Sequence, residues 1–187
     1  MTNSPQCSPS STTASSNSPL ATQTGWSQER IGRGVERVWP EWFVQALPGQ
    51  YPLHREPPVW LVVGGRGAGK TRLGAEWVNA LARGLAPFAR HRHGQIALVG
   101  ETLADVRRVM IEGVSGLMAI HCADERPELE ISKAQLVWPN GTIAQMFSAE
   151  DPDSLRGPQF DAAWCDELAK WRRPEETWDM LQFGMRL

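Results

Sequence analysis

The stretch GGRGAGKT, Gly64 to Thr71, is rich in glycine and directly follows the apolar run VWLVV. It matches the pattern GxxxxGK[ST], in which glycines let the backbone curl until its N–H groups point at phosphate oxygens. The lysine then reaches the terminal phosphates, and the last hydroxyl supplies a ligand to Mg²⁺. A glycine-rich turn with an exposed lysine is the alternative, but a strand before the loop and a helix after it favour a phosphate site. The predicted ATP-binding residues are Gly64, Gly65, Arg66, Gly67, Ala68, Gly69, Lys70 and Thr71.

The segments on either side of this loop carry the patterns of a strand and a helix. Residues 59–63 are apolar throughout, which is typical of a central parallel strand buried on both faces. Residues 71–85 have apolar side chains at helical spacing, and Gly84 ends the pattern. The predicted inner face of this helix consists of Leu73, Trp77, Ala80 and Leu81.

Strands and helices are predicted to alternate along the rest of the chain. Residues 95–100 indicate a second strand, and residues 102–120 a second helix with Thr102 as its N-cap. Alternating polar and apolar residues around Asn140-Gly141 predict a β-hairpin. Residues 160–165 form another apolar strand, followed by a helical segment rich in Trp and Arg. The expected fold class is α/β, with a mainly parallel sheet flanked by helices and an added hairpin.

Two adjacent carboxylates, Asp166 and Glu167, follow the apolar run Ala162–Cys165. Beside a P-loop, an acidic residue at the end of a neighbouring strand holds the metal, and the next carboxylate polarises an attacking water. The pair could equally form the acidic first turn of a helix, where it would favour the dipole. With the loop present, we interpret Asp166 as a Mg²⁺ ligand together with Thr71, and Glu167 as the catalytic base of a hydrolase.

Arg66 is an unusual residue for the interior of such a loop. A guanidinium among phosphate-binding amides adds a fixed charge that could reach the transferring phosphoryl group. A solvated loop arginine is an equal alternative, so the sequence leaves both interpretations of Arg66 open.

Composition limits the remaining possibilities. The formal net charge of -2 carries no global signature of nucleic-acid binding, and three separated cysteines favour neither a disulfide framework nor a zinc site. No long apolar run or signal-peptide pattern is present, so we expect no membrane span and no secretion. Residues 1–24 have the composition of a disordered Ser/Thr/Pro-rich tail, and residues 25–58 that of a helical lead-in with a Pro-rich connector. Residues 59–187 are the expected ATPase domain.

The segments around the loop and the acidic pair resemble a known family. WLVVGGRGAGKTRLGAEWVNALA and SAEDPDSLRGPQFDAAWCDELAKW are similar to the ATPase half of the large terminase subunit of tailed bacteriophages and gene transfer agents. The resemblance extends from about Trp42 to Leu187. It implies an ASCE-type P-loop NTPase fold and a motor that uses ATP and Mg²⁺ to thread double-stranded DNA into a capsid.

The resemblance also implies roles for particular residues and partners. Lys70 and Glu167 would be catalytic, Arg66 would be the arginine that acts in cis, and Gln50 would read adenine. A polar residue in a Pro-rich linker remains an alternative for Gln50. The implied partners are the portal protein, the procapsid, the small terminase subunit and identical subunits in a ring. The implied location is the portal vertex of a capsid in the bacterial cytoplasm, with no membrane contact.

The sequence departs from the family's pattern at FGMRL, where it ends. Family members continue into a Thr-rich coupling strand and a nuclease domain. We therefore expect a C-terminally truncated ATPase domain, an incomplete sheet and no nuclease activity from this chain. A helicase-like translocase, and a docking fragment that binds nucleotide without turnover, are the alternative functions.

Several other residues are candidates for binding. Two basic runs could contact DNA phosphates, although a solvated face is the more common role for such runs. They consist of Arg83, Arg90, His91, Arg92 and His93, and of Lys170, Arg172 and Arg173. His121 lacks partner ligands at metal-binding spacing. Trp60, Trp77 and Trp164 fall in predicted buried elements, where core packing is favoured over base stacking.

Overall fold

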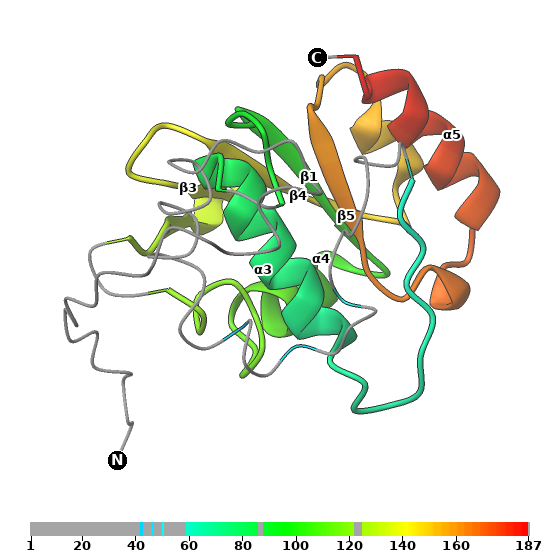
Figure 1. Ribbon diagram of the computed structural model, residues 1–187. Helices are drawn as coiled ribbons and strands as arrows, with labels where there is room; N and C mark the ends of the chain where they lie inside the picture. Colours follow the sequence, from blue (N-terminus) through cyan, green and yellow to red (C-terminus); the bar gives the residue numbers. More distant parts are fainter. Residues whose placement is uncertain are drawn as a thin grey trace, which may run out of the picture.

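The computed structural model describes residues 42, 46, 50, 59–85, 88–121 and 125–186. Five strands form one sheet, with helices packed on its faces (Figure 1). The predicted tail over residues 1–24 and most of the lead-in over residues 25–58 lie outside the described residues, as do Cys7 and Cys122. The division of the chain into these segments therefore remains a prediction.

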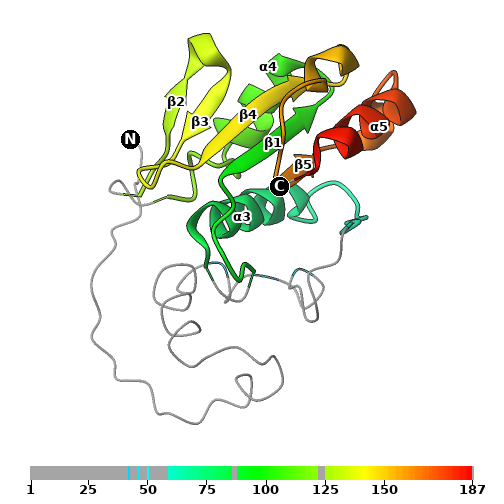
Figure 2. The ribbon, with the colours of Figure 1, turned by 90° about the horizontal axis from the view of Figure 1, so that it is seen from above.

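The sheet has the strand order β2-β3-β4-β1-β5, which Figure 2 shows side by side. Its strands are β1 (Gln95–Gly100), β2 (Glu128–Glu130), β3 (Gln135–Val137), β4 (Ile143–Ser148) and β5 (Ala162–Cys165). β1 pairs in parallel with β4 and β5, whereas β3 pairs antiparallel with β2 and β4. The α/β class is confirmed, but the sheet is mixed rather than mainly parallel, because β2 and the β3–β4 hairpin are part of it.

The turn of the β3–β4 hairpin confirms the prediction at Asn140-Gly141. Gly141 has a φ of 84°, in the left-handed region that glycine adopts without a steric penalty. The Asn140 side-chain oxygen accepts a hydrogen bond from the Thr142 N–H at 3.0 Å. The local chemistry of the turn thus sets the register of the two strands.

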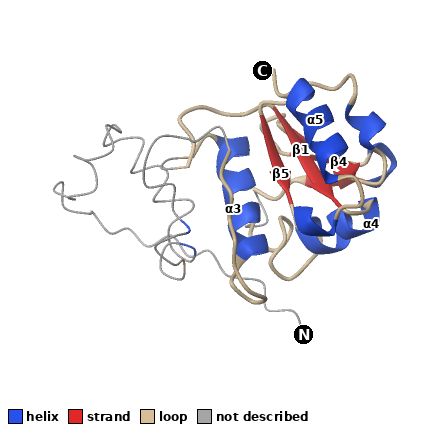
Figure 3. Cartoon of the chain, turned by 90° about the vertical axis from the view of Figure 1, so that its right-hand side faces the viewer, coloured by secondary structure: helices blue, strands red, loops and turns tan. Residues whose placement is uncertain are grey.

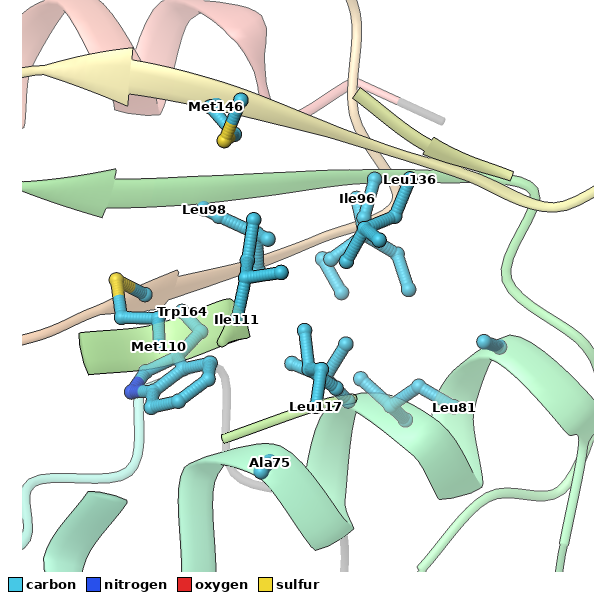
Figure 4. Close-up of a cluster of buried hydrophobic side chains, with 14 of the residues drawn as sticks. Ala75, Leu81, Ile96, Leu98, Met110, Ile111, Leu117, Leu136, Met146 and Trp164 are labelled. Atoms are coloured by element: carbon cyan, nitrogen blue, oxygen red, sulfur yellow. The ribbon is translucent and has the colours of Figure 1, made fainter. Parts of the chain in front are cut away.

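β1 separates two hydrophobic cores because its side chains alternate between the faces of the sheet. Ile96 and Leu98 point to the first core, which packs against helix α3 (Lys70–Arg83), and Ala97 and Val99 point to the second. Figure 4 shows the first core filling the space between the sheet and α3. The second core packs against α5 (Pro174–Gly184), so the two helices lie on opposite faces of the sheet (Figure 3).

Helix α3 confirms the helix predicted after the loop. It ends at the C-cap Gly84, which has a φ of 67°. Leu73, Ala80 and Leu81 are buried as predicted, while Trp77 is half-buried. Gly74 brings the helix close to β5, since a Cβ at this position would lie 2.2 Å from the Trp164 ring.

The second predicted helix is shorter than expected and changes its geometry. Thr102 caps α4 (Leu103–Asp105), since its side chain accepts a hydrogen bond from the Asp105 N–H at 3.0 Å. The chain continues as the π-helix η2 (Val106–Ile111). The described residues also include the short 3₁₀ helices η3 (Ile131–Lys133), η4 (Pro152–Leu155) and η5 (Leu168–Lys170). The Trp- and Arg-rich helix predicted after the acidic pair is present as η5 and α5.

The predicted strand at residues 59–63 is wrong. The segment forms no strand, and Leu61 and Val63 are 81% and 86% exposed. Trp60 is half-buried, where it packs against the cluster that contains Trp42. An apolar run becomes a central strand only if other strands pair with it, and none of the described strands pairs with this one.

Candidate functional site at the carboxyl ends of β1 and β5

The loop Gly64–Thr71 curls around the ammonium group of Lys70. Lys70 Nζ donates hydrogen bonds to the carbonyl oxygens of Gly64 at 2.9 Å and Gly65 at 3.0 Å. Gly67 and Gly69 have φ values of 78° and 76°, which only glycine adopts readily. The predicted glycines are therefore used to bring the backbone around a positive charge.

The N-terminus of α3 is open at the end of this loop. Gly69 is its N-cap, no side chain caps it among the described residues, and its first turn holds no acidic residue. Thr71 lies half-buried in that first turn. The free N–H groups and the helix dipole make such an end suited to an anion, as in a phosphate site.

The acidic pair follows β5 directly and is held by the backbone of its neighbours. The Asp166 N–H donates to the Val99 carbonyl oxygen of β1 at 3.0 Å. Glu167 has a φ of 49°, a left-handed conformation that is unfavourable for a residue with a Cβ. Its carboxylate forms an ion pair with the Lys170 ammonium group, and both side chains are at least half exposed.

Charge links the loop to the acidic pair. Burial raises the pKa of Asp166, the negative Glu167 raises it further, and the positive Lys70 and Lys170 oppose the rise. The charge of Lys70 thus acts on Asp166 although the two residues are far apart in sequence, and α3 packs closely against β5 at Gly74 and Trp164. The hydroxyl of Thr71 and the carboxylate of Asp166 are hard oxygen donors of the kind that Mg²⁺ prefers.

A small hollow lies beside the acidic pair. Its lining consists of Gly100, Glu101, Asp105, Val109, Met110, Asp166, Glu167 and Lys170. Sequence reasoning missed Glu101 and Asp105 as members of the site. Glu101 directly follows the strand at residues 95–100, so its position at a carboxyl strand end was the available signal. Lys170 was considered only as a candidate DNA contact.

Two further predicted residues lie in or near the loop. Arg66 is exposed within it. Gln50 is buried, and its side-chain amide donates to the Ala68 carbonyl oxygen at 3.2 Å. A Cβ on Gly69 would lie 3.0 Å from the same amide nitrogen. The structure therefore brings Gln50 to the loop despite the separation in sequence.

Several side chains of the two basic runs form hydrogen bonds or ion pairs within the protein. Arg83 donates to both carboxylate oxygens of Glu125, at 2.6 and 2.5 Å. Arg92 donates to the Asn140 carbonyl oxygen, and the rings of His91 and His93 stack at 4.7 Å. In the second run, Arg173 lies 3.8 Å from Glu176, and Lys170 pairs with Glu167. Contact of either run with DNA remains a prediction.

His121 and Cys165 have structural surroundings. His121 is buried, its Nδ1 lies 2.5 Å from the Leu117 carbonyl oxygen, and its Nε2 accepts the Trp138 indole N–H at 3.2 Å. Burial lowers the pKa of His121 to about 4, so the ring is neutral at pH 7. Burial raises the pKa of the Cys165 thiol to about 12, and the negative charge of Asp166 contributes to this rise. The thiol is therefore a poor nucleophile.

The described residues contain no cluster of three or more His, Cys, Asp or Glu residues that could hold a metal ion. None of their helices has both the length and the hydrophobicity needed to cross a bilayer.

Comparison with known proteins gives a family for the chain. Neither the curated proteins nor the solved structures that were compared gave a significant match. The family model described as terminase large subunit, T4likevirus-type, N-terminal matches residues 61–187, which is well over half of the chain. The matched region contains the loop, the acidic pair and both cores. The chain therefore belongs to the T4likevirus-type terminase large subunit family, and it matches the N-terminal region of that family.

Proposed function

We propose that this chain is an ATP-hydrolysing motor subunit of a terminase that packages double-stranded DNA into a viral or phage-like capsid. Membership of the family suggests a role in DNA packaging in general. The observation that carries the finer proposal is the close packing of α3 against β5, where a Cβ at Gly74 would lie 2.2 Å from the Trp164 ring, because α3 follows the loop and β5 precedes the acidic pair. P-loop hydrolases require this combination.

The residues present fit ATP and Mg²⁺. The uncapped N-terminus of α3 and the curled backbone of Gly64–Gly69 offer N–H groups to phosphate oxygens. Lys70 already occupies the centre of the loop, where its ammonium group would exchange two carbonyl partners for phosphates. The Thr71 hydroxyl and Asp166 carboxylate would hold Mg²⁺, which when bound neutralises charge that develops on the phosphates.

Each remaining side chain has a proposed role in this site. Glu167 would orient and deprotonate the attacking water, since it directly follows Asp166 at the carboxyl end of β5. Arg66, exposed in the loop, would stabilise the negative charge of the transferring phosphoryl group. Gln50 would hydrogen-bond to adenine, and its bond to Ala68 would link base recognition to the loop.

The proposed partners follow from the proposed function. We expect the chain to act with double-stranded DNA, a portal protein, a procapsid, a small terminase subunit and further copies of itself in a ring. The expected location is the portal vertex in the bacterial cytoplasm. A helicase-like ATPase would share the site, but it would respond to a forked duplex instead of to a portal.

A second candidate function is nucleotide binding without turnover. The ion pair between Glu167 and Lys170 favours it, because a carboxylate held by an ammonium group is not free to orient water. The exposed segment at residues 59–63 supports the same candidate, since the loop lacks a strand that would fix its start. A measurement of phosphate release distinguishes the two candidates, because a motor hydrolyses ATP and a docking subunit does not.

The test compares the wild-type chain with Lys70→Ala and Glu167→Gln. ATP binding is measured by titration calorimetry with Mg²⁺, and hydrolysis by phosphate release in a single turnover. Lys70→Ala should weaken ATP binding by about 100-fold or more, since it removes the charge that faces the terminal phosphates. Glu167→Gln should preserve binding and slow hydrolysis by about 100-fold or more.

The matched control is Lys133→Ala, which removes an exposed lysine from a surface ion pair with Glu130. It should leave both binding and hydrolysis unchanged. Unchanged ATP affinity in a folded Lys70→Ala variant would contradict the phosphate site. Binding without measurable hydrolysis in the wild-type chain would support the docking function in place of the motor.

A further inference from the structure

We propose that Trp171 is the positioning residue of the acidic turn, and this inference rests on the proposed role of Asp166 and Glu167. The indole N–H of Trp171 donates to the backbone carbonyl oxygen of Asp166 at 3.1 Å. That carbonyl belongs to the peptide group that joins Asp166 to Glu167. The hydrogen bond therefore acts on the peptide that sets the direction of the Glu167 carboxylate relative to Asp166.

The turn needs such a contact because its backbone is strained. Glu167 has a φ of 49°, and residues with a Cβ remain in this region only where the surroundings hold them there. Asp166 is held from the other side, since its N–H donates to the Val99 carbonyl oxygen at 3.0 Å. The two hydrogen bonds of Asp166 thus clamp the turn between β1 and Trp171.

Trp171 is itself fixed by packing. It is only 5% exposed and lies in the second core, together with Phe147 of β4, Leu155 of η4 and Leu181 of α5. Its ring cannot move without displacing these neighbours, because protein cores are close-packed. The position of the indole N–H, and through it the Asp166 carbonyl, is therefore set by the face of the sheet that α5 covers.

Trp171 acts on the turn through its backbone and not by contact with a substrate. The ring lies in the core, and its one polar atom bonds to the backbone of the turn. A shift in this peptide would displace the proposed water-orienting carboxylate while leaving Lys70 and the loop in place. Errors of about 1 Å in such groups cost up to about 100-fold in rate, so hydrolysis is more sensitive to Trp171 than binding is.

A second tryptophan provides a matched control. Trp138 is 2% exposed, and its indole N–H donates to His121 at 3.2 Å. It packs in the first core, away from the acidic turn. Trp138→Phe and Trp171→Phe each remove one buried indole hydrogen bond and part of an aromatic ring, so they separate a loss of stability from a loss of positioning.

The test measures ATP affinity, single-turnover hydrolysis and melting temperature for the wild-type chain and both variants. Trp171→Phe should slow hydrolysis by about 10- to 100-fold while ATP affinity stays within about twofold. Trp138→Phe should lower the melting temperature and leave the hydrolysis rate of the folded protein unchanged. β-(3-Benzothienyl)alanine at position 171, which keeps the shape but lacks the N–H, should reproduce the rate loss. A normal rate with this analogue would overturn the inference.

A second readout separates this inference from the proposed function. If the wild-type chain does not hydrolyse ATP, the proposed function fails, and the conformation of the turn is then measured by NMR. The three-bond coupling between HN and Hα of Glu167 reports its φ, and exchange of the Lys170 N–H reports its bond to the Glu167 carbonyl, 2.8 Å in the structure. Both should change in Trp171→Phe and not in Trp138→Phe. Unchanged values in Trp171→Phe would overturn the positioning role independently of activity.

Discussion

The two halves of the site differ in how they are joined to the rest of the protein. Asp166 and Glu167 continue a strand of the sheet, and their peptide groups bond to β1 and to a buried tryptophan. The loop Gly64–Thr71 follows an exposed segment that forms no strand, and the two hydrogen bonds of Lys70 are made within the loop itself. The acidic half is therefore organised before a ligand arrives, whereas the loop has to exchange its own contacts for those of the phosphates.

The largest expected effect concerns the sheet beneath the acidic half. Leu98 is fully buried in β1, in the core that β5 and α3 share. Leu98→Ala should lower the free energy of unfolding by about 2–5 kcal/mol, because it leaves a cavity in close-packed surroundings. Chemical denaturation measures this loss. A loss below about 1 kcal/mol would remove the distinction between a rigid acidic half and a less constrained loop.

The second prediction concerns acid and His121, whose Nε2 lies 2.8 Å from the Asn79 Oδ1 of α3. Because burial lowers the pKa of His121 to about 4 in the folded state, the unfolded chain takes up a proton first as the pH falls below 6.5. The contribution of neutral His121 to the free energy of unfolding is therefore fully present above pH 6.5. It is lost between pH 6.5 and 4, by about 3 kcal/mol at most. Denaturation at several pH values measures the decline. His121→Gln should abolish this part of the pH dependence, and an identical slope in that variant would assign it to other groups.

The third prediction concerns the contact between the two halves. Gly74→Ala would place a methyl group 2.2 Å from the Trp164 ring, so α3 and β5 would have to move apart. We expect a loss of about 1–3 kcal/mol in the free energy of unfolding, from overpacking. The control is Gly94→Ala, whose Cβ would lie 3.6 Å from the nearest side-chain atom, an ordinary contact. Equal stability of the two variants would show that the close approach of α3 to β5 is absent in solution.

The smallest expected effect concerns the segment before the loop. Leu61 is 81% exposed, so Leu61→Ala should change the free energy of unfolding by less than about 0.5 kcal/mol. The same substitution at Leu98 then provides a direct comparison of the two halves. A loss at Leu61 as large as at Leu98 would mean that the segment is buried in solution and that the originally predicted strand forms there.

Much of the fold could be predicted because local signals agreed with tertiary packing. The helix after the loop has both an apolar stripe and a terminating glycine, and Thr102 has a capping side chain directly before a helical pattern. Asn140-Gly141 encodes its own turn. In each of these cases, a few residues that are neighbours in the sequence stabilise the local structure, so the sequence pattern was sufficient to predict it.

The failures have a common physical cause, which is that the deciding contacts are distant in sequence. Residues 59–63 have the composition of a central strand, but pairing depends on a neighbour, which the composition of the segment does not reveal. The same limit applies to the site. Glu101 joins the acidic turn because β1 pairs with β5, which lies far along the chain. Trp171 is near the turn in sequence, but its place in the second core depends on residues of other elements.

The π-helix η2 has a consequence for insertions and deletions in this chain. Its wider turn is seen in the bond from the Glu112 N–H to the Arg107 carbonyl oxygen, at 2.8 Å, and it lets Val106, Met110 and Ile111 all face the first core. In an α-helix, with about 100° per residue, Ile111 would point about 140° away from Val106. The wall of the hollow next to Asp166 is therefore one residue longer than a regular helix would make it. Removal of a single residue between Val106 and Met110 would restore regular geometry with Ile111 about 40° from Val106, still facing the first core, and would shorten the wall of the hollow without altering either motif.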